Sequence, residues 1–130
     1  MPRPTPLRRA TVFQRNVWRV VAQITLYKLG PAGTIRLVLF DRDSYMIATM
    51  PAATCLTIAS PGRDAALAAR AAFLKRCGRP TQHWQPLGAV AYVSGVGFWS
   101  GHAHGLRGTA PNGAQLTPVT SLRFVAGCGA

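Results

Sequence analysis

The sequence predicts a mostly β domain with one helix, in which five strands form a small barrel in the order β-β-β-α-β-β. Five segments carry apolar residues at alternate positions, which is typical of half-buried strands. One segment between the third and fourth strands has helical spacing, and Gly- and Pro-containing turns separate the segments. The chain has 130 residues, of which 48% are hydrophobic, so one domain with one core is expected.

The first three strands are predicted at residues 18–27, 34–41 and 45–50. On the first, the side chains expected on the core face are Trp18, Val20, Ala22, Ile24 and Leu26. On the second, they are Ile35, Leu37 and Leu39. A Gly30–Gly33 turn and an Arg42–Ser44 turn join the three strands, and Pro51 ends the third. Short turns between consecutive strands predict an antiparallel meander.

The helix is predicted from its end signals. Ser60 is a suitable N-cap, Pro61 suits the first helical position, and Asp64 lies in the first turn, where the helix dipole favours an anion. The last turn carries Lys75 and Arg76, and Gly78 and Pro80 follow it. The apolar stripe predicted to face the core consists of Leu67, Ala71 and Leu74, with Phe73 beside it.

Two more strands are predicted at residues 87–99 and 119–125, with a long loop over residues 100–118 between them. On the fourth strand, the large side chains share one face, which we expect to be the core face: Val90, Tyr92, Val96 and Phe98. Gly95 and Gly97 occupy the other face, so we expect a bend or the close approach of another backbone there.

This element order is that of the OB-fold, a five-stranded, partly open Greek-key barrel. We therefore expect an OB-fold-like domain over residues 16–130, preceded by a flexible basic arm over residues 1–15. No stretch approaches the roughly 20 apolar residues of a membrane-spanning helix, so no membrane span is expected.

Charge restricts the classes of function. Fifteen Lys and Arg residues face only three acids (Asp41, Asp43 and Asp64), which gives a net charge of +12. Three carboxylates argue against two-carboxylate glycosidase chemistry and against carboxylate-rich Mg²⁺ or Ca²⁺ sites. The balance favours an anionic partner such as nucleic acid, anionic lipid or an acidic polymer. The alternative is an Arg-rich composition without a polyanionic partner.

The three cysteines, at positions 55, 77 and 128, form no CxxC pair, which argues against a zinc ribbon. Cys55 and Cys77 bracket the predicted helix and could form a disulfide, with Cys128 free. The alternative is three reduced thiols. Localisation stays open on the residues alone, because the basic N-terminal segment has no apolar region behind it.

OB-folds bind ligands on the face of strands two and three, between the loops that join strands one to two and four to five. The predicted ligand-binding residues are Arg36, Arg42, Trp99, His102, His104, Arg107 and Asn112. Exposed arginines beside aromatic side chains suit single-stranded DNA or RNA, because bases stack and phosphates meet charge. Further candidates of these two kinds are Arg19, Tyr27, Trp84 and Phe98. The alternative for Phe98 and Trp84 is packing in the core or a lid.

The histidines offer a metal-binding alternative. His102 and His104 form an H-x-H pair that could share a metal ion if His83, Asp43 or a thiol supplied a third ligand. Histidines that hold the shape of the loop through hydrogen bonds are the other interpretation, and we expect no cofactor.

Three segments carry a resemblance: VSGVGFW at 93–99, HGLRGTAPN at 104–112 and LTPV at 116–119. They resemble a family of small bacterial proteins of unknown function, over roughly residues 20–126. The family pattern has Glu and His where this chain has Gln115 and Thr117, so no acid–base role is expected at these positions. Members are commonly exported, which implies an oxidising compartment and supports the disulfide of Cys55 with Cys77.

A second, local resemblance concerns residues 34–41, TIRLVLFD, which are similar to the second strand of the staphylococcal nuclease family. The resemblance implies that Arg36 would bind a phosphate and that Asp41 would bind Ca²⁺, with Asp43 near the position of the catalytic glutamate. The first strand, however, lacks the family's metal-binding aspartate. An outward Arg–Asp pair on a barrel strand is the simpler interpretation.

The sequence thus favours a non-enzymatic binding module for an anionic ligand, most plausibly single-stranded nucleic acid. A divergent metal-assisted nuclease using Arg36, Asp41 and Asp43 is the alternative from another class. An exported protein that binds an acidic polymer or a protein partner is the third.

Overall fold

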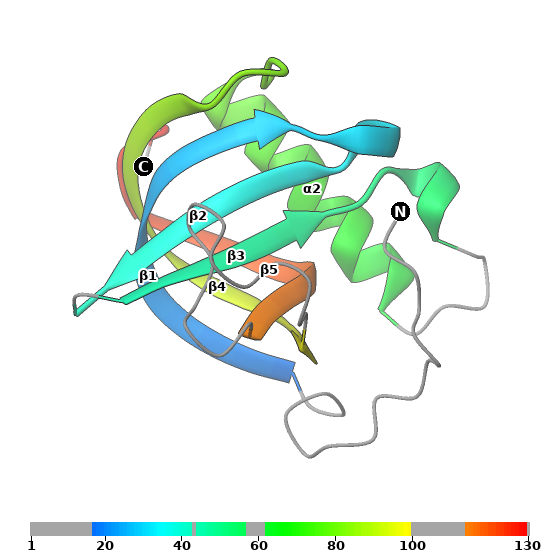
Figure 1. Ribbon diagram of the computed structural model, residues 1–130, viewed down its shortest axis with the longest axis horizontal. Helices are drawn as coiled ribbons and strands as arrows, with labels where there is room; N and C mark the ends of the chain where they lie inside the picture. Colours follow the sequence, from blue (N-terminus) through cyan, green and yellow to red (C-terminus); the bar gives the residue numbers. More distant parts are fainter. Residues whose placement is uncertain (1–16, 43, 57–61, 100–113, 130) are drawn as a thin grey trace.

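The computed structural model describes residues 17–42, 44–56, 62–99 and 114–129. It is mostly β with one helix (Figure 1). The elements are β1 (Val17–Leu29), β2 (Ile35–Asp41), β3 (Ser44–Met50), α2 (Arg63–Cys77), β4 (Gln85–Trp99) and β5 (Ala114–Ala126). Short 3-10 turns, η1 (Pro31–Gly33) and η2 (Ala53–Cys55), follow β1 and β3. The predicted order β-β-β-α-β-β is confirmed. The predicted arm over residues 1–15 lies outside the described residues.

The five strands form one mixed sheet that closes in a ring, with the neighbour order β1-β2-β3-β5-β4. The predicted meander is confirmed, because β1 pairs with β2 and β2 pairs with β3, both antiparallel. β4 pairs antiparallel with both β1 and β5. A short parallel pairing of β3 with β5, Ile47 with Gln115 and Ala48 with Leu116, completes the ring.

The core fills the ring and extends onto α2. Leu37, Ala48, Val93 and Leu116 are fully buried inside the sheet, each from a different strand. α2 lies along one side of the ring (Figure 1) and adds Phe73, whose ring makes an edge contact with Tyr27 at a centroid distance of 5.5 Å. The helix therefore packs against β5 and β3 of the ring.

The first strand changes faces in its middle, which the sequence pattern does not reveal. Ala22 and Ile24 are buried as predicted, but the pairing register shifts between Ile24 and Leu26. A bulge adds one residue to one strand, so the alternation of faces reverses beyond it. Tyr27 is consequently buried against Phe73, and Leu26 is only half-buried. The prediction for Trp18 was also wrong, because its side chain is 40% exposed.

The helix starts later than predicted, and its buried face matches the predicted one only in part, because Phe73 is buried and Leu74 packs against the core as expected. It begins at Arg63, with Gly62 (φ 76°) as its N-cap, so the predicted capping role of Ser60 was wrong; Ser60 and Pro61 lie outside the described residues. Its buried residues are Ala66, Ala69 and Phe73, whereas Ala71 of the predicted stripe is exposed. Small side chains let a helix approach a sheet closely, and the one large buried ring anchors it. The predicted end is confirmed: Gly78 has φ 88°, and its N–H donates to the Leu74 carbonyl at 3.2 Å.

Arg70 ties the helix to the end of β3. Its Nη1 donates to the Met50 carbonyl oxygen at 2.7 Å. Burial lowers the pKa of the Arg70 guanidinium, and the nearby Cys55 opposes this shift. Arginine nevertheless stays protonated at neutral pH. This cation therefore has a structural role.

The core face of β4 is the opposite of the predicted one. The buried residues are Ala89, Ala91, Val93, Gly95 and Gly97. Val90, Tyr92 and Val96 are half-buried on the outer face, and the side chain of Phe98 lies outside the description. The predicted close approach of another backbone is confirmed. A Cβ at Gly95 would lie 2.9 Å from the Pro118 carbonyl oxygen. A small residue is therefore required at Gly95 of β4, where the register with the neighbouring β5 shifts.

β5 starts at Ala114, within the stretch predicted as loop. Residues 114–118 are held by partners far away in the chain: Ala114 pairs with Trp99, and Gln115 pairs with Ile47. Local alternation does not reveal such pairings.

The disulfide joins Cys77 at the end of α2 to Cys128 just beyond β5, with a Cα–Cα distance of 4.8 Å. The predicted pairing of Cys55 with Cys77 was therefore wrong. Cys55 is free, and its thiol lies 3.8 Å from the Ala32 carbonyl oxygen. The physical reason is the path of β5, which packs along α2 and brings its own end to the end of the helix.

We expect the bond to show directly in a peptide map. Without reduction, a peptide pair containing Cys77 and Cys128 should be found, and Cys55 should react with an alkylating reagent.

Replacing Cys128 by Ser should lower the free energy of unfolding by about 2–4 kcal/mol, because a crosslink restricts the unfolded chain. The control Cys55→Ser should change it little. A crosslinked peptide containing Cys55 would contradict this assignment.

The close contact between paired β4 and β5 at Gly95 predicts that Gly95→Ala destabilises the fold by about 1–3 kcal/mol, through overpacking. Gly30→Ala is the matched control, because the nearest atom to its added Cβ would be the flexible Arg36 Cδ at 3.2 Å. Urea unfolding of both variants measures the difference. Equal stability of the two variants would rule out a close contact of β5 with Gly95.

Candidate functional site

The pairing of β2 with β3 sets the composition of their shared outer face. Ile35, Leu37 and Leu39 point into the core, so alternate residues of β2 point outward. The register places each of these opposite an outward residue of β3, and β5 continues the face. We call this the β2–β3–β5 outer face, and its residues are Arg36, Val38, Phe40, Tyr45, Ile47, Thr49, Gln115 and Thr117.

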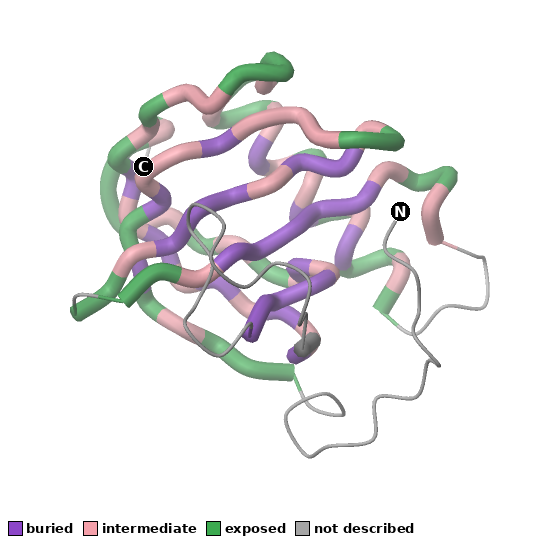
Figure 2. The backbone as a smooth tube through the Cα atoms, viewed as in Figure 1, coloured by how far each residue is buried: buried purple, intermediate pink, exposed green. Residues whose placement is uncertain are grey.

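The middle of this face is closed. Val38 and Ile47, which pair across the strands, are 1% and 0% exposed, and the neighbouring Gln115 is 8% exposed. The hydroxyl groups of Thr49 and Thr117 are buried and hydrogen-bonded to each other. Figure 2 shows the buried stretch along both strands. On this face, the residues that are not buried lie at its two ends: Phe40 and Tyr45 at one end and Arg36 at the other.

An aromatic pair forms one end. The rings of Phe40 and Tyr45 lie at a centroid distance of 4.8 Å and are tilted by 47°. Tyr45 is 46% exposed and Phe40 is half-buried. The β2–β3 turn follows directly, with Arg42 exposed at φ 50°. An exposed ring of this kind offers a flat surface on which a nucleobase can stack.

Sequence reasoning missed this aromatic pair. A three-residue turn was predicted at residues 42–44, whereas Asp41 pairs with Ser44 and leaves two residues between them. The shorter turn sets Phe40 opposite Tyr45. A two-residue turn between Asp41 and Ser44 would have predicted that Phe40 pairs with Tyr45.

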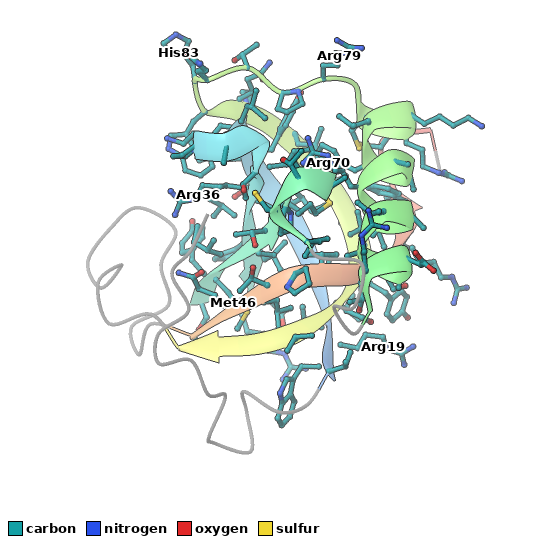
Figure 3. The ribbon with its side chains drawn as sticks, turned by 90° about the vertical axis from the view of Figure 1, so that its right-hand side faces the viewer. Arg19, Arg36, Met46, Arg70, Arg79 and His83 are labelled. Carbon is teal, nitrogen blue, oxygen red and sulfur yellow. A yellow bond between two sulfur atoms is a disulfide. The ribbon has the colours of Figure 1, made fainter. Side chains whose placement is uncertain are left out.

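Two cations lie near the other end. Lys28 of β1 is opposite Arg36 of β2 in register. Lys28 Nζ lies 4.9 Å from the ring centroid of Trp84, and Arg36 is half-buried. Figure 3 shows Arg36 on the side of the ring away from α2. Within the described parts of the chain, the only ion pair is Arg63–Asp64 at 3.9 Å, so neither cation has a carboxylate partner there.

The predicted nuclease residues are not brought together. Arg36 and Asp41 lie five positions apart on β2, which separates their backbones by about 16 Å. An odd separation also directs the two side chains to opposite faces of the strand. Asp41 is exposed, and Asp43 lies outside the described residues.

Most of the predicted loop site also lies outside the described residues: His102, His104, Arg107 and Asn112, together with the side chain of Trp99. The prediction of Tyr27 as a stacking residue was wrong, because Tyr27 lies in the core and is only 7% exposed.

His83 is exposed, and its backbone N–H donates to Thr81 Oγ1 at 3.3 Å. Nowhere in the described ranges do three His, Cys, Asp or Glu residues cluster so that they could hold a metal ion.

Among the described residues, no helix is long and apolar enough to cross a membrane; α2 has only 15 residues. In comparisons with known proteins, no family model matches the chain, and no curated protein matches it.

Proposed function

We propose that this chain is an OB-fold-like, non-enzymatic module that binds single-stranded nucleic acid. The ring order β1-β2-β3-β5-β4 and the helix between β3 and β4 support the OB-fold assignment. In that fold the ligand contacts strands two and three, which carry the outer face described above.

One observation carries the proposal. Where β2 turns into β3, the exposed Tyr45 contacts the half-buried Phe40, and the exposed cation Arg42 lies in the turn beside this aromatic pair. Base stacking on aromatic rings and charge attraction to phosphates are the two interactions that modules for single strands combine. The net charge of +12 adds long-range attraction for a polyanion.

The alternatives predict other behaviour. A metal-assisted phosphodiesterase using Arg36, Asp41 and Asp43 would shorten the oligonucleotide when Ca²⁺ is added. An exported protein that binds an acidic polymer would bind heparin as tightly as an oligonucleotide, because stacking would contribute nothing. The same assay separates these functions.

The test is fluorescence anisotropy with 5′-labelled dT15 and U15 at two salt concentrations, with Ca²⁺ or with EDTA. We expect salt-dependent binding that EDTA does not change, and a probe that stays intact on a gel. Tyr45→Ala should raise Kd about 5- to 150-fold, corresponding to about 1–3 kcal/mol of lost stacking. Tyr45→Phe keeps the ring and should bind almost as tightly as the original chain.

Arg42→Gln removes the exposed cation in the turn beside the Phe40–Tyr45 pair, and it should weaken binding and lower the slope of log K against log salt by about 0.7, because one phosphate contact is lost. Lys75→Gln removes the same charge from the exposed surface of α2 and should leave the slope unchanged. Absence of binding at 50 mM salt would overturn the proposed function. Cleavage that requires Ca²⁺ would replace it with the nuclease.

A further inference from the structure

A second group of cations and aromatics lies on the other side of the ring, on the outer face of β1, β4 and β5. The Cζ atoms of Arg19 and Arg123 lie 5.3 Å and 5.5 Å from the ring centroid of Tyr92. Arg19 comes from β1 and Arg123 from β5, so the two guanidinium groups approach Tyr92 from the strands on either side of β4. We call these three residues the Arg–Tyr–Arg ladder.

The donors around the ladder suit phosphate. Ser94 is opposite Arg19 on one side and opposite Ser121 on the other, so hydroxyl groups lie one row from the ladder. Arginine presents a planar fork of N–H donors that matches a phosphate group, and stacking on a ring orients this fork. The sequences of β1, β4 and β5 contain no Asp or Glu. Two neighbouring guanidinium groups without a carboxylate favour an anionic ligand.

The ladder is connected to the aromatic pair through two outward residues of β1, Gln23 and Val21. Gln23 of β1 is exposed and lies opposite Phe40 of β2 on one side and Val90 of β4 on the other. One step further along β1, Val21 is 45% exposed and lies opposite Tyr92. An open strip therefore runs from Tyr45 across β2 and β1 to Tyr92 and Arg123.

The strip has a suitable length. Tyr45 to Val90 crosses three strand spacings, about 14 Å, and Tyr92 lies two residues further along β4, about 7 Å. A path of about 20 Å holds several nucleotides, in line with the roughly 4–16 nucleotides that one OB-fold binds. The direct path across β2, β3 and β5 is closed by the buried Val38, Ile47 and Gln115.

We infer that single-stranded nucleic acid runs around the ring, from the Phe40–Tyr45 pair over Gln23 to the Arg–Tyr–Arg ladder, and does not cross the middle of the β2–β3–β5 outer face. This inference rests on the proposed function and specifies the path of the ligand. Bases stack on Tyr45, and Arg19 and Arg123 bind phosphates further along the strand.

The test compares two double variants that lose the same charge. Arg19→Gln with Arg123→Gln should raise the Kd for labelled dT15 roughly 10- to 100-fold and lower the salt slope by about 1.4, because two phosphate contacts are lost. Lys75→Gln with Arg79→Gln removes two exposed cations elsewhere (Figure 3 labels Arg79) and should change Kd less than about threefold. Thermal unfolding of each variant verifies that the fold is intact.

Ultraviolet crosslinking supplies a second measurement on the unaltered chain. With U15, crosslinked peptides should contain both Tyr45 and Tyr92. If dT15 binds and Tyr45→Ala weakens it, but Arg19→Gln with Arg123→Gln does not and Tyr92 is not crosslinked, the path is wrong and the proposed function stands. If the unaltered chain does not bind dT15 or U15 at all, both the function and the path are overturned.

Discussion

The pairing of β4 with two partners is the constraint on which the rest of the structure depends. This 15-residue strand pairs with β1 along one side and with β5 along the other. β5 in turn reaches β3 through its short parallel pairing and thereby closes the ring. Inward positions of β4 are occupied by glycine where its register with β5 shifts, and at Gly95 even one added carbon would meet the backbone of Pro118. The closed ring therefore depends on residues that contribute little to the core by volume.

Closure also determines the surface. In each strand, every second side chain points outward, and the pairing register places outward side chains of neighbouring strands opposite one another in rows across the sheet. The row of Phe40 and Tyr45 and the ladder around Tyr92 both follow from this geometry. The bulge after Ile24 gives β1 a second role, because beyond it Tyr27 turns inward to pack against Phe73. One strand thus contributes both to the outer strip and to the contact with α2.

The sequence predicted the element order and the β2 core face correctly, because short turns and strict alternation are local signals. It failed wherever a distant partner decides the outcome. The helix face was only partly right: Phe73 and Leu74 pack against the core as predicted, but Ala66 and Ala69 are buried, whereas Ala71 of the predicted stripe is exposed. The disulfide was wrong because Cys77 meets Cys128 only after β5 has folded along α2. Of the candidate site, Arg36 and Arg42 were predicted as exposed arginines, of which Arg42 is exposed and Arg36 is half-buried. Tyr45 was missed because its partner depends on the length of the turn.

The central claim is that aromatic rings and arginines on the outside of a closed ring bind a single strand of nucleic acid. The most direct measurement is a titration of the ¹⁵N-labelled chain with dT15, followed by ¹H–¹⁵N correlation spectra. The account predicts large, salt-dependent shifts for the amides around Tyr45, Gln23 and Tyr92, and small shifts for the buried middle of β3 around Ile47. Spectra that do not change with added dT15 would contradict it, as would shifts confined to α2.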